Sequence, residues 1–190
     1  MGQSNQSAWD YGSSAPPSVY GALPYGAPAG HDLGGPLCLT FAAFSPTILH
    51  SVLIDAKANI HYRVESNSSP IFTFIKDSRG RSVAIIEWRS HPTIEIRGVA
   101  PKQSIQNWLG LSRDGLSRIM TVGNRQYAWA PNGRHICLYA TSSAAPQPLV
   151  TVSKTQATVT LEVTPRALEL GLLEPSIVAT VLLQSGRNID

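Results

Sequence analysis

Short runs in which apolar and polar residues alternate recur along the chain from Pro36 onward, and turn-forming residues separate them. An alternation with a period of two predicts strands with one buried face. Turns such as Pro131-Asn-Gly133 join neighbouring runs closely enough for antiparallel hairpins. No long helical pattern lies between the runs, which argues against a parallel sheet. The twelve predicted strands cover residues 37–42, 50–55, 59–65, 70–76, 82–89, 93–98, 102–109, 117–122, 125–130, 134–140, 148–153 and 157–163.

A helical signal appears only after the last predicted strand. Thr164 is a suitable N-cap, and Pro165 suits the first helical position. From Pro175 to Leu183, apolar residues cover almost the whole circumference of a helix, which predicts burial in protein or in a membrane. The charge-free run 177–183 has seven residues, whereas a membrane span needs about 20. We therefore predict a central helix surrounded by a closed or nearly closed sheet.

The composition agrees with a turn-rich β domain. The chain has 190 residues with 15 glycines and 14 prolines, and only 14% of its residues are charged. This length suffices for one domain with a sizeable core. Residues 1–34 are rich in Gly, Pro, Ser and Tyr, so we predict a disordered tail there and a β-barrel domain over residues 35–190. The N-terminus lacks the basic and apolar regions of a signal peptide, which predicts an intracellular protein.

Scattered apolar and aromatic motifs between residues 36 and 184 resemble a known architecture. The motifs are Leu53-Ile-Asp55, Tyr62-Arg-Val64, Ile86-Glu-Trp88, Ser117-Arg118, Tyr127-Ala-Trp129, Leu138-Tyr139 and Ile177-Val-Ala-Thr-Val-Leu-Leu183. The chain is similar to the tubby-like proteins, which include phospholipid scramblases and plant LURP-one-related proteins, and more closely to an uncharacterised fungal family with this predicted fold. The resemblance implies a twelve-stranded antiparallel barrel threaded by its C-terminal helix. It implies no catalytic role, and phosphoinositide binding follows by analogy of fold alone.

Basic residues are concentrated in the middle of the chain. Between Lys76 and Arg134 there are ten basic and four acidic residues, a net charge of +6, whereas the whole chain carries +3. The hairpin 76–81 places three bases beside a glycine turn, and turn amides with arginine forks suit a phosphate group. The alternative is a solvated tip whose charges discourage edge pairing. The predicted phosphate- or lipid-binding residues are Lys76, Arg79, Arg81 and Arg89.

Aromatic side chains provide a second candidate site. Trp88, Tyr127 and Trp129 stand at strand positions, where they either line a ligand pocket or pack in the core. The sequence has no histidine or cysteine spacing of a metal site and no nucleophile motif, so we expect no metal, no cofactor and no catalytic residue. Cys38 and Cys137 lie in apolar strands, and the sequence leaves open whether they are free or form a disulfide.

These observations predict a non-catalytic binding module that recognises an anionic phospholipid or phosphoinositide at a membrane surface. We therefore expect a cytoplasmic protein with peripheral membrane association and no transmembrane segment. Two alternatives stay open, namely a protein-interaction or regulatory scaffold without a small ligand, and a small-ligand barrel or hydrolase. The mild net charge of +3 does not call for nucleic acid as a partner, and the sequence leaves the oligomeric state open.

Overall fold

The structure is a computed structural model that describes residues 34–43, 47–67, 71–142, 146–156 and 158–190. These residues belong to one compact unit, Leu33–Asp190. The tail that the sequence predicts over residues 1–34 lies outside the described residues, except for Gly34.

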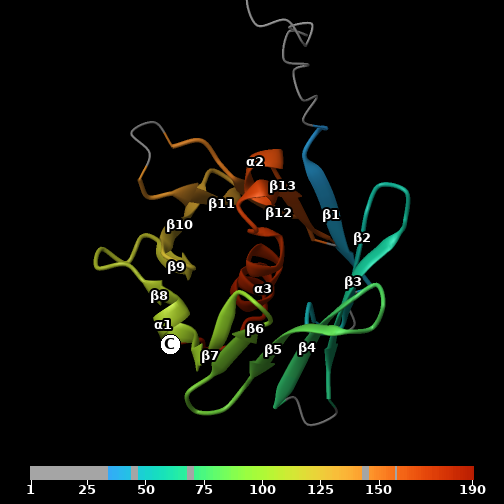
Figure 1. The fold of residues 1–190 in the computed structure, drawn as a ribbon, viewed down its shortest axis with the longest axis horizontal. Helices are drawn as coiled ribbons and strands as arrows, with labels where there is room; N and C mark the ends of the chain where they lie inside the picture. Colours follow the sequence, from blue (N-terminus) through green and yellow to red (C-terminus); the bar gives the residue numbers. More distant parts are fainter. Residues whose placement is uncertain (1–33, 44–46, 68–70, 143–145, 157) are drawn as a thin grey trace, which may run out of the picture. The chain divides into compact units, whose positions relative to one another are not determined.

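In the described part of the chain, thirteen strands form one antiparallel sheet that curls around the last helix (Figure 1). Strands that follow one another in the sequence are paired, except for β7 and β8, and β1 also pairs with β13. Because β7 and β8 are the two ends of the hydrogen-bonded order, the sheet is not closed. The strands are β1 (Leu37–Ala42), β2 (Ser51–Ile54), β3 (Ile60–Ser66), β4 (Phe72–Asp77), β5 (Ser82–Glu87), β6 (Thr93–Ile96), β7 (Ala100–Ser104), β8 (Leu109–Leu111), β9 (Arg118–Val122), β10 (Arg125–Asn132), β11 (His135–Ala140), β12 (Val150–Lys154) and β13 (Val159–Val163).

The extra strand arises where the sequence predicts a single strand over residues 102–109. The structure instead has the end of β7, a short helix α1 (Ile105–Trp108) and the start of β8. Ile105 and Trp108 are three residues apart, so a helical turn can bury both side chains on one face, whereas a strand would place them on opposite faces. The predicted count of twelve strands is therefore wrong by one.

Two helices follow the last strand in the described chain, and the first begins where the sequence predicts a helix start. The first, α2 (Pro165–Glu169), has Pro165 at its first position. The hydroxyl of Thr164 caps it by accepting a hydrogen bond from the Ala167 N–H at 3.2 Å. Gly171 has a φ of 68°, and this left-handed conformation separates α2 from the next helix.

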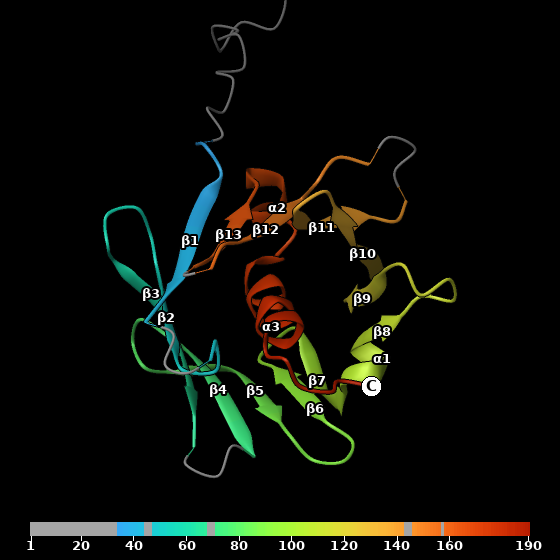
Figure 2. The same cartoon turned by 180° about the vertical axis from the view of Figure 1, so that it is seen from behind.

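The second helix, α3 (Leu173–Gln184), is the centre of the core. Strands lie around it in both views (Figures 1 and 2), and the residues Pro175–Leu182 are all buried. The hydroxyl of Thr180 is satisfied within the helix, because it donates to the Ser176 carbonyl at 2.7 Å. The predicted all-β fold with a buried C-terminal helix is confirmed. Among the described residues, no helix combines the length and the apolar character that crossing a membrane requires.

The curled sheet has two rims, because successive turns of an antiparallel sheet alternate between its edges. α3 runs from one rim to the other. The α2 rim contains α2 and the turns 55–59, 77–81, 97–99 and 123–124. The C-terminal rim contains the turns 88–92, 112–117 and 133–134 and the final segment 185–190.

Candidate anion-binding site

The hairpin tip between β4 and β5 carries three of the four predicted cations, and two of them are in ion pairs. Lys76 Nζ lies 2.6 Å from Glu65, and Arg81 lies 2.7 Å from Asp77. Asp77 also accepts hydrogen bonds from the backbone N–H groups of Arg79 and Arg81. The Arg79 side chain has no acidic partner among the described residues. At this tip, only Arg79 is therefore available to an external anion.

The fourth predicted cation, Arg89, lies on the C-terminal rim, whereas the hairpin tip lies on the α2 rim. The length of β5, about 20 Å, separates the two positions. Arg89 pairs with Glu87, which also binds Lys102 Nζ at 2.7 Å. The hydrogen bond from Lys102, more than any other interaction, lowers the pKa of Glu87, so this carboxylate stays ionised. The structure does not bring the four predicted cations together in one site.

The three predicted pocket aromatics have different environments. Trp88 is buried, its Nε1 donates to Thr73 Oγ1 at 2.8 Å, and the Arg187 guanidinium lies 4.9 Å from the ring centre. This distance is typical of a cation–π interaction. Trp129 is buried and contributes to a small pocket of about 190 Å³ on the C-terminal rim. Tyr127 contributes to a much larger pocket on the other rim.

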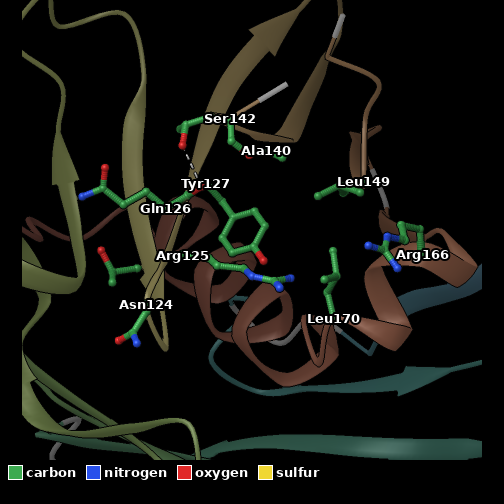
Figure 3. A pocket seen from close by; sticks show the side chains of 11 residues that line it. Asn124, Arg125, Gln126, Tyr127, Ala140, Ser142, Leu149, Arg166 and Leu170 are labelled. Atoms are coloured by element: carbon green, nitrogen blue, oxygen red, sulfur yellow. Dashed lines mark hydrogen bonds between the residues drawn. The ribbon is translucent and has the colours of Figure 1, made fainter. Parts of the chain in front are cut away.

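This larger pocket, of about 930 Å³, opens on the α2 rim (Figure 3). Its walls come from the turn between β9 and β10, from the end of β11, and from α2 with its flanking residues. A second pocket of about 450 Å³ adjoins it and shares Arg125 and Tyr127 with it. The residues that line the larger pocket are Thr121, Asn124, Arg125, Gln126, Tyr127, Ala140, Thr141, Ser142, Leu149, Arg166 and Leu170.

The local sequence explains why Arg125 and Tyr127 reach the same space. Gly123 has a φ of 57°, which permits the tight turn from β9 into β10. Side chains two residues apart in a strand share a face, so Arg125 lies on the same face of β10 as the inward-facing Tyr127. Figure 3 shows the Tyr127 hydroxyl and the Arg125 side chain directed into the pocket.

Neither of these two groups has a partner in the described part of the chain. Tyr127 is only 2% exposed, yet its hydroxyl makes no hydrogen bond to a described residue. Arg125 is exposed at the mouth of the pocket and forms no ion pair with a described residue. The hydroxyl oxygen is not among the buried side-chain atoms without a partner, so it faces the open space of the pocket, where solvent or a ligand can bind it.

Arg166 faces this pair from α2. Its Nη1 donates to the carboxylate of Glu169 at 2.8 Å, three residues further along the helix. Both side chains are largely exposed, at 65% and 47%, so this ion pair contributes only about 0.3–0.5 kcal/mol. An anion in the pocket can therefore recruit Arg166 at little cost.

The lining of the pocket supplies hydrogen-bond donors for an anion. Two guanidinium groups and a phenol converge on it, and arginine forks bind phosphate or carboxylate groups through paired hydrogen bonds. No described lining residue carries a carboxylate, an imidazole or a thiol. Within the described ranges, no three potential metal ligands of the His, Cys, Asp or Glu type stand together.

Cys38 and Cys137 are free thiols, which settles the alternative that the sequence leaves open. Cys38 on β1 is paired with Glu162, Glu162 with Thr151, and Thr151 with Cys137 on β11. Three strand spacings, about 14 Å, thus separate the two cysteines. A disulfide needs α-carbons within about 7 Å, so these two residues cannot form one.

The sequence identifies Tyr127 as a pocket candidate but does not single out Arg125 or Arg166. A signal for Arg125 exists, because it lies two residues before Tyr127 and directly after the turn Gly123-Asn124. Arg166 carries no comparable signal. Only the tertiary structure brings α2 beside the turn between β9 and β10.

A curled antiparallel sheet, a buried C-terminal helix and a donor-lined pocket define an all-β protein with a candidate anion-binding site. The chain belongs to the family of unknown function DUF6593, whose model matches residues 46–188. It is also similar to a protein from Arabidopsis thaliana of known X-ray structure, with 12% identity and a TM-score of 0.44 over 78% of this chain and 89% of that chain. No curated protein matches the chain.

Proposed function

We propose that this protein is a non-catalytic module that binds the anionic headgroup of a phospholipid at a membrane surface, in the pocket on the α2 rim. One observation carries the proposal. Arg125 has no acidic partner among the described residues and lines the same pocket as Tyr127, a buried residue whose accessible hydroxyl also lacks a partner there. A phosphate group provides the acceptors that both side chains need.

Other cations on the α2 rim support contact with an anionic surface. Lys57, Arg79 and Arg97 stand in three different turns of this rim, and all three are exposed. None of them forms an ion pair with a described residue. Each basic residue near an anionic bilayer contributes about 1 kcal/mol of attraction. We propose that these residues orient the rim toward the membrane while the pocket holds one headgroup, which makes this a cytoplasmic protein of the membrane periphery.

We also propose that the family belongs to the tubby-like proteins, as a fungal branch. The motifs that carry the resemblance and the sheet that surrounds a C-terminal helix support this assignment. Thirteen strands and the unpaired edges of β7 and β8 distinguish this protein from a closed twelve-stranded barrel.

Co-sedimentation of the full chain with vesicles tests the proposal. We expect binding to vesicles that contain phosphatidylserine, no binding to pure phosphatidylcholine vesicles, and a loss of binding as salt rises. Arg125→Glu should weaken binding by roughly tenfold or more, because it reverses the charge at the pocket. Arg113→Glu is the matched control, since Arg113 is exposed in a turn of the C-terminal rim and has no ion pair with a described residue.

Equal losses in the two variants would contradict the pocket as the site, because they would indicate attraction by net charge alone. Binding that survives high salt, or equal binding to neutral vesicles, would contradict the role of charge. A chain that binds none of the vesicles would instead favour the protein-interaction scaffold.

A further inference from the structure

We infer that the pocket is selective for a terminal phosphate monoester over a phosphodiester. This inference rests on the proposed function and narrows it to one class of ligand. The ligand enters with its phosphate first and leaves the rest of the molecule at the mouth, as either a lipid headgroup or a small soluble phosphate. Three features carry the inference, namely the depth of Tyr127, the two facing guanidinium groups and the absence of acidic groups from the described lining.

The depth of Tyr127 requires an oxygen at the end of the ligand. The residue is 2% exposed, so a ligand reaches its hydroxyl only from inside the pocket. A monoester presents three terminal oxygens and has one substituent, which can remain on the open side. A diester has substituents on two sides and only two terminal oxygens. It therefore either turns a substituent inward or leaves the Tyr127 hydroxyl without an acceptor.

The charges in the pocket favour a dianion. Arg125 and Arg166 come from different walls, and each offers several N–H donors in a planar fork. Among the described residues, the only carboxylate bound to either is that of Glu169, which contributes to the adjoining pocket and not to this one. A phosphate monoester carries close to two negative charges at neutral pH, because its second pKa is about 6. It can therefore engage both guanidinium groups, whereas a diester has a single charge.

The mouth of the pocket has room for the remainder of the ligand. Leu149 and Leu170 lie on the side of α2 and supply apolar surface. Asn124, Gln126 and Ser142 lie on the side of β10 and β11 and supply polar groups. A glycerol or a similar small polar unit next to the phosphate fits this mixed surface.

The test compares two anionic lipids that differ in the phosphate. The full chain is sedimented with phosphatidylcholine vesicles that contain equal fractions of either phosphatidic acid, a monoester, or phosphatidylglycerol, a diester. At pH 7.5 we expect roughly tenfold tighter binding to the monoester vesicles. At pH 5 the monoester carries about one charge, so the preference should largely disappear. In parallel, calorimetry compares soluble glycerol 3-phosphate with dimethyl phosphate, which identifies a soluble source of the same chemistry.

Two variants localise the effect. Tyr127→Phe removes the hydroxyl and keeps the buried ring, so it should reduce the preference for the monoester several-fold. Tyr139→Phe is the control, because Tyr139 is a β11 residue whose hydroxyl bonds to Asn132 near the other rim.

The outcomes separate the inference from the proposed function. Equal binding to the two lipids at pH 7.5, or an unchanged preference in Tyr127→Phe, overturns the inference and leaves lipid binding intact. Binding of glycerol 3-phosphate without binding to any vesicle supports the inference with a soluble ligand and overturns the membrane proposal. Failure to bind either lipid and either soluble ester overturns both.

Discussion

The two ends of the hairpin β9–β10 carry one arginine each, and the two arginines have opposite surroundings. On the C-terminal rim, Arg118 donates to both carboxylate oxygens of Asp190, at 2.9 and 2.7 Å, and to the Leu109 carbonyl. On the α2 rim, Arg125 stands beside Tyr127 without an acidic partner in the described chain. The same residue type thus holds the fold together at one end and is available to a ligand at the other.

The final segment of the chain explains much of this difference. Arg187 lies over Trp88, Ile189 is buried, and Asp190 pairs with Arg118, so residues 187–190 connect the end of β5 to the start of β9. The chain end lies close to α1 and β7 (Figure 2). This segment supplies a carboxylate to the C-terminal rim beside the unpaired edges β7 and β8. Whether an arginine is available to a ligand therefore depends on the position of acidic partners, and not on the density of basic residues.

The largest effect is expected in α3, on which both rims depend. Val178→Asp places an unpaired charge at a position with no exposed surface, and such a change costs about 4 kcal/mol or more. Thermal unfolding followed by circular dichroism should show a protein that is unfolded or close to it. Leu168→Asp is the control, since Leu168 is 39% exposed on α2, and this variant should remain folded. A well-folded Val178→Asp protein would refute the central position of α3.

An intermediate effect is expected when the paired arginine is released. Asp190→Ala leaves Arg118 without its carboxylate, which should lower the free energy of unfolding by about 1 kcal/mol at pH 7. Hydrogen bonds from Arg118 hold the pKa of Asp190 in the folded protein below its ordinary value. The stabilisation by this ion pair is therefore fully present above the unfolded-state pKa, which is near 4. It is lost as the pH falls through the lower folded-state pKa. Urea titrations of both proteins should therefore converge at strongly acidic pH.

The same variant sharpens the comparison between the rims. The loss of one negative charge should by itself increase binding to anionic vesicles. If binding requires the pocket, the release of Arg118 in Asp190→Ala should cause no further increase. Asp114→Ala removes one negative charge from an exposed turn on the same rim and measures that background. A much larger gain in Asp190→Ala would mean that any unpaired arginine suffices.

The smallest effect is expected at the weak ion pair on α2. Glu169→Gln removes the carboxylate that competes for Arg166, so binding to phosphatidic acid vesicles should tighten by about two- to threefold. Arg166→Gln should weaken the same binding. Opposite changes in the two variants indicate that Arg166 contacts the ligand, whereas parallel losses would indicate that the pair only supports α2.

Local pattern predicts most of the fold. Alternation along each strand and the apolar circumference of α3 both report burial directly, and Thr164 and Pro165 mark the start of α2 through local capping chemistry. The strand predicted over residues 102–109 is wrong, because alternation cannot distinguish a strand from a single helical turn that buries Ile105 and Trp108.

The site is predicted less well, because the pairing of a charge depends on residues far away in the sequence. Asp190 is 72 residues from Arg118, and Lys102 is 15 residues from Glu87. The density of basic residues points to the hairpin 76–81, where Glu65 and Asp77 engage two of its three bases. The strand position and the aromatic ring of Tyr127 are local properties, so the sequence could indicate this residue. The lack of a hydrogen-bond partner for its hydroxyl depends on the tertiary structure and could not be predicted.

The position of α3 has a consequence for how the chain acquires its structure during synthesis. All thirteen strands precede the helix that fills their centre. At about 5–20 residues per second, the time between the first strand and α3 leaving the ribosome is on the order of ten seconds. Throughout that time the inner face of the sheet has no helix to cover it. The domain therefore completes its fold only after α3 itself has been translated.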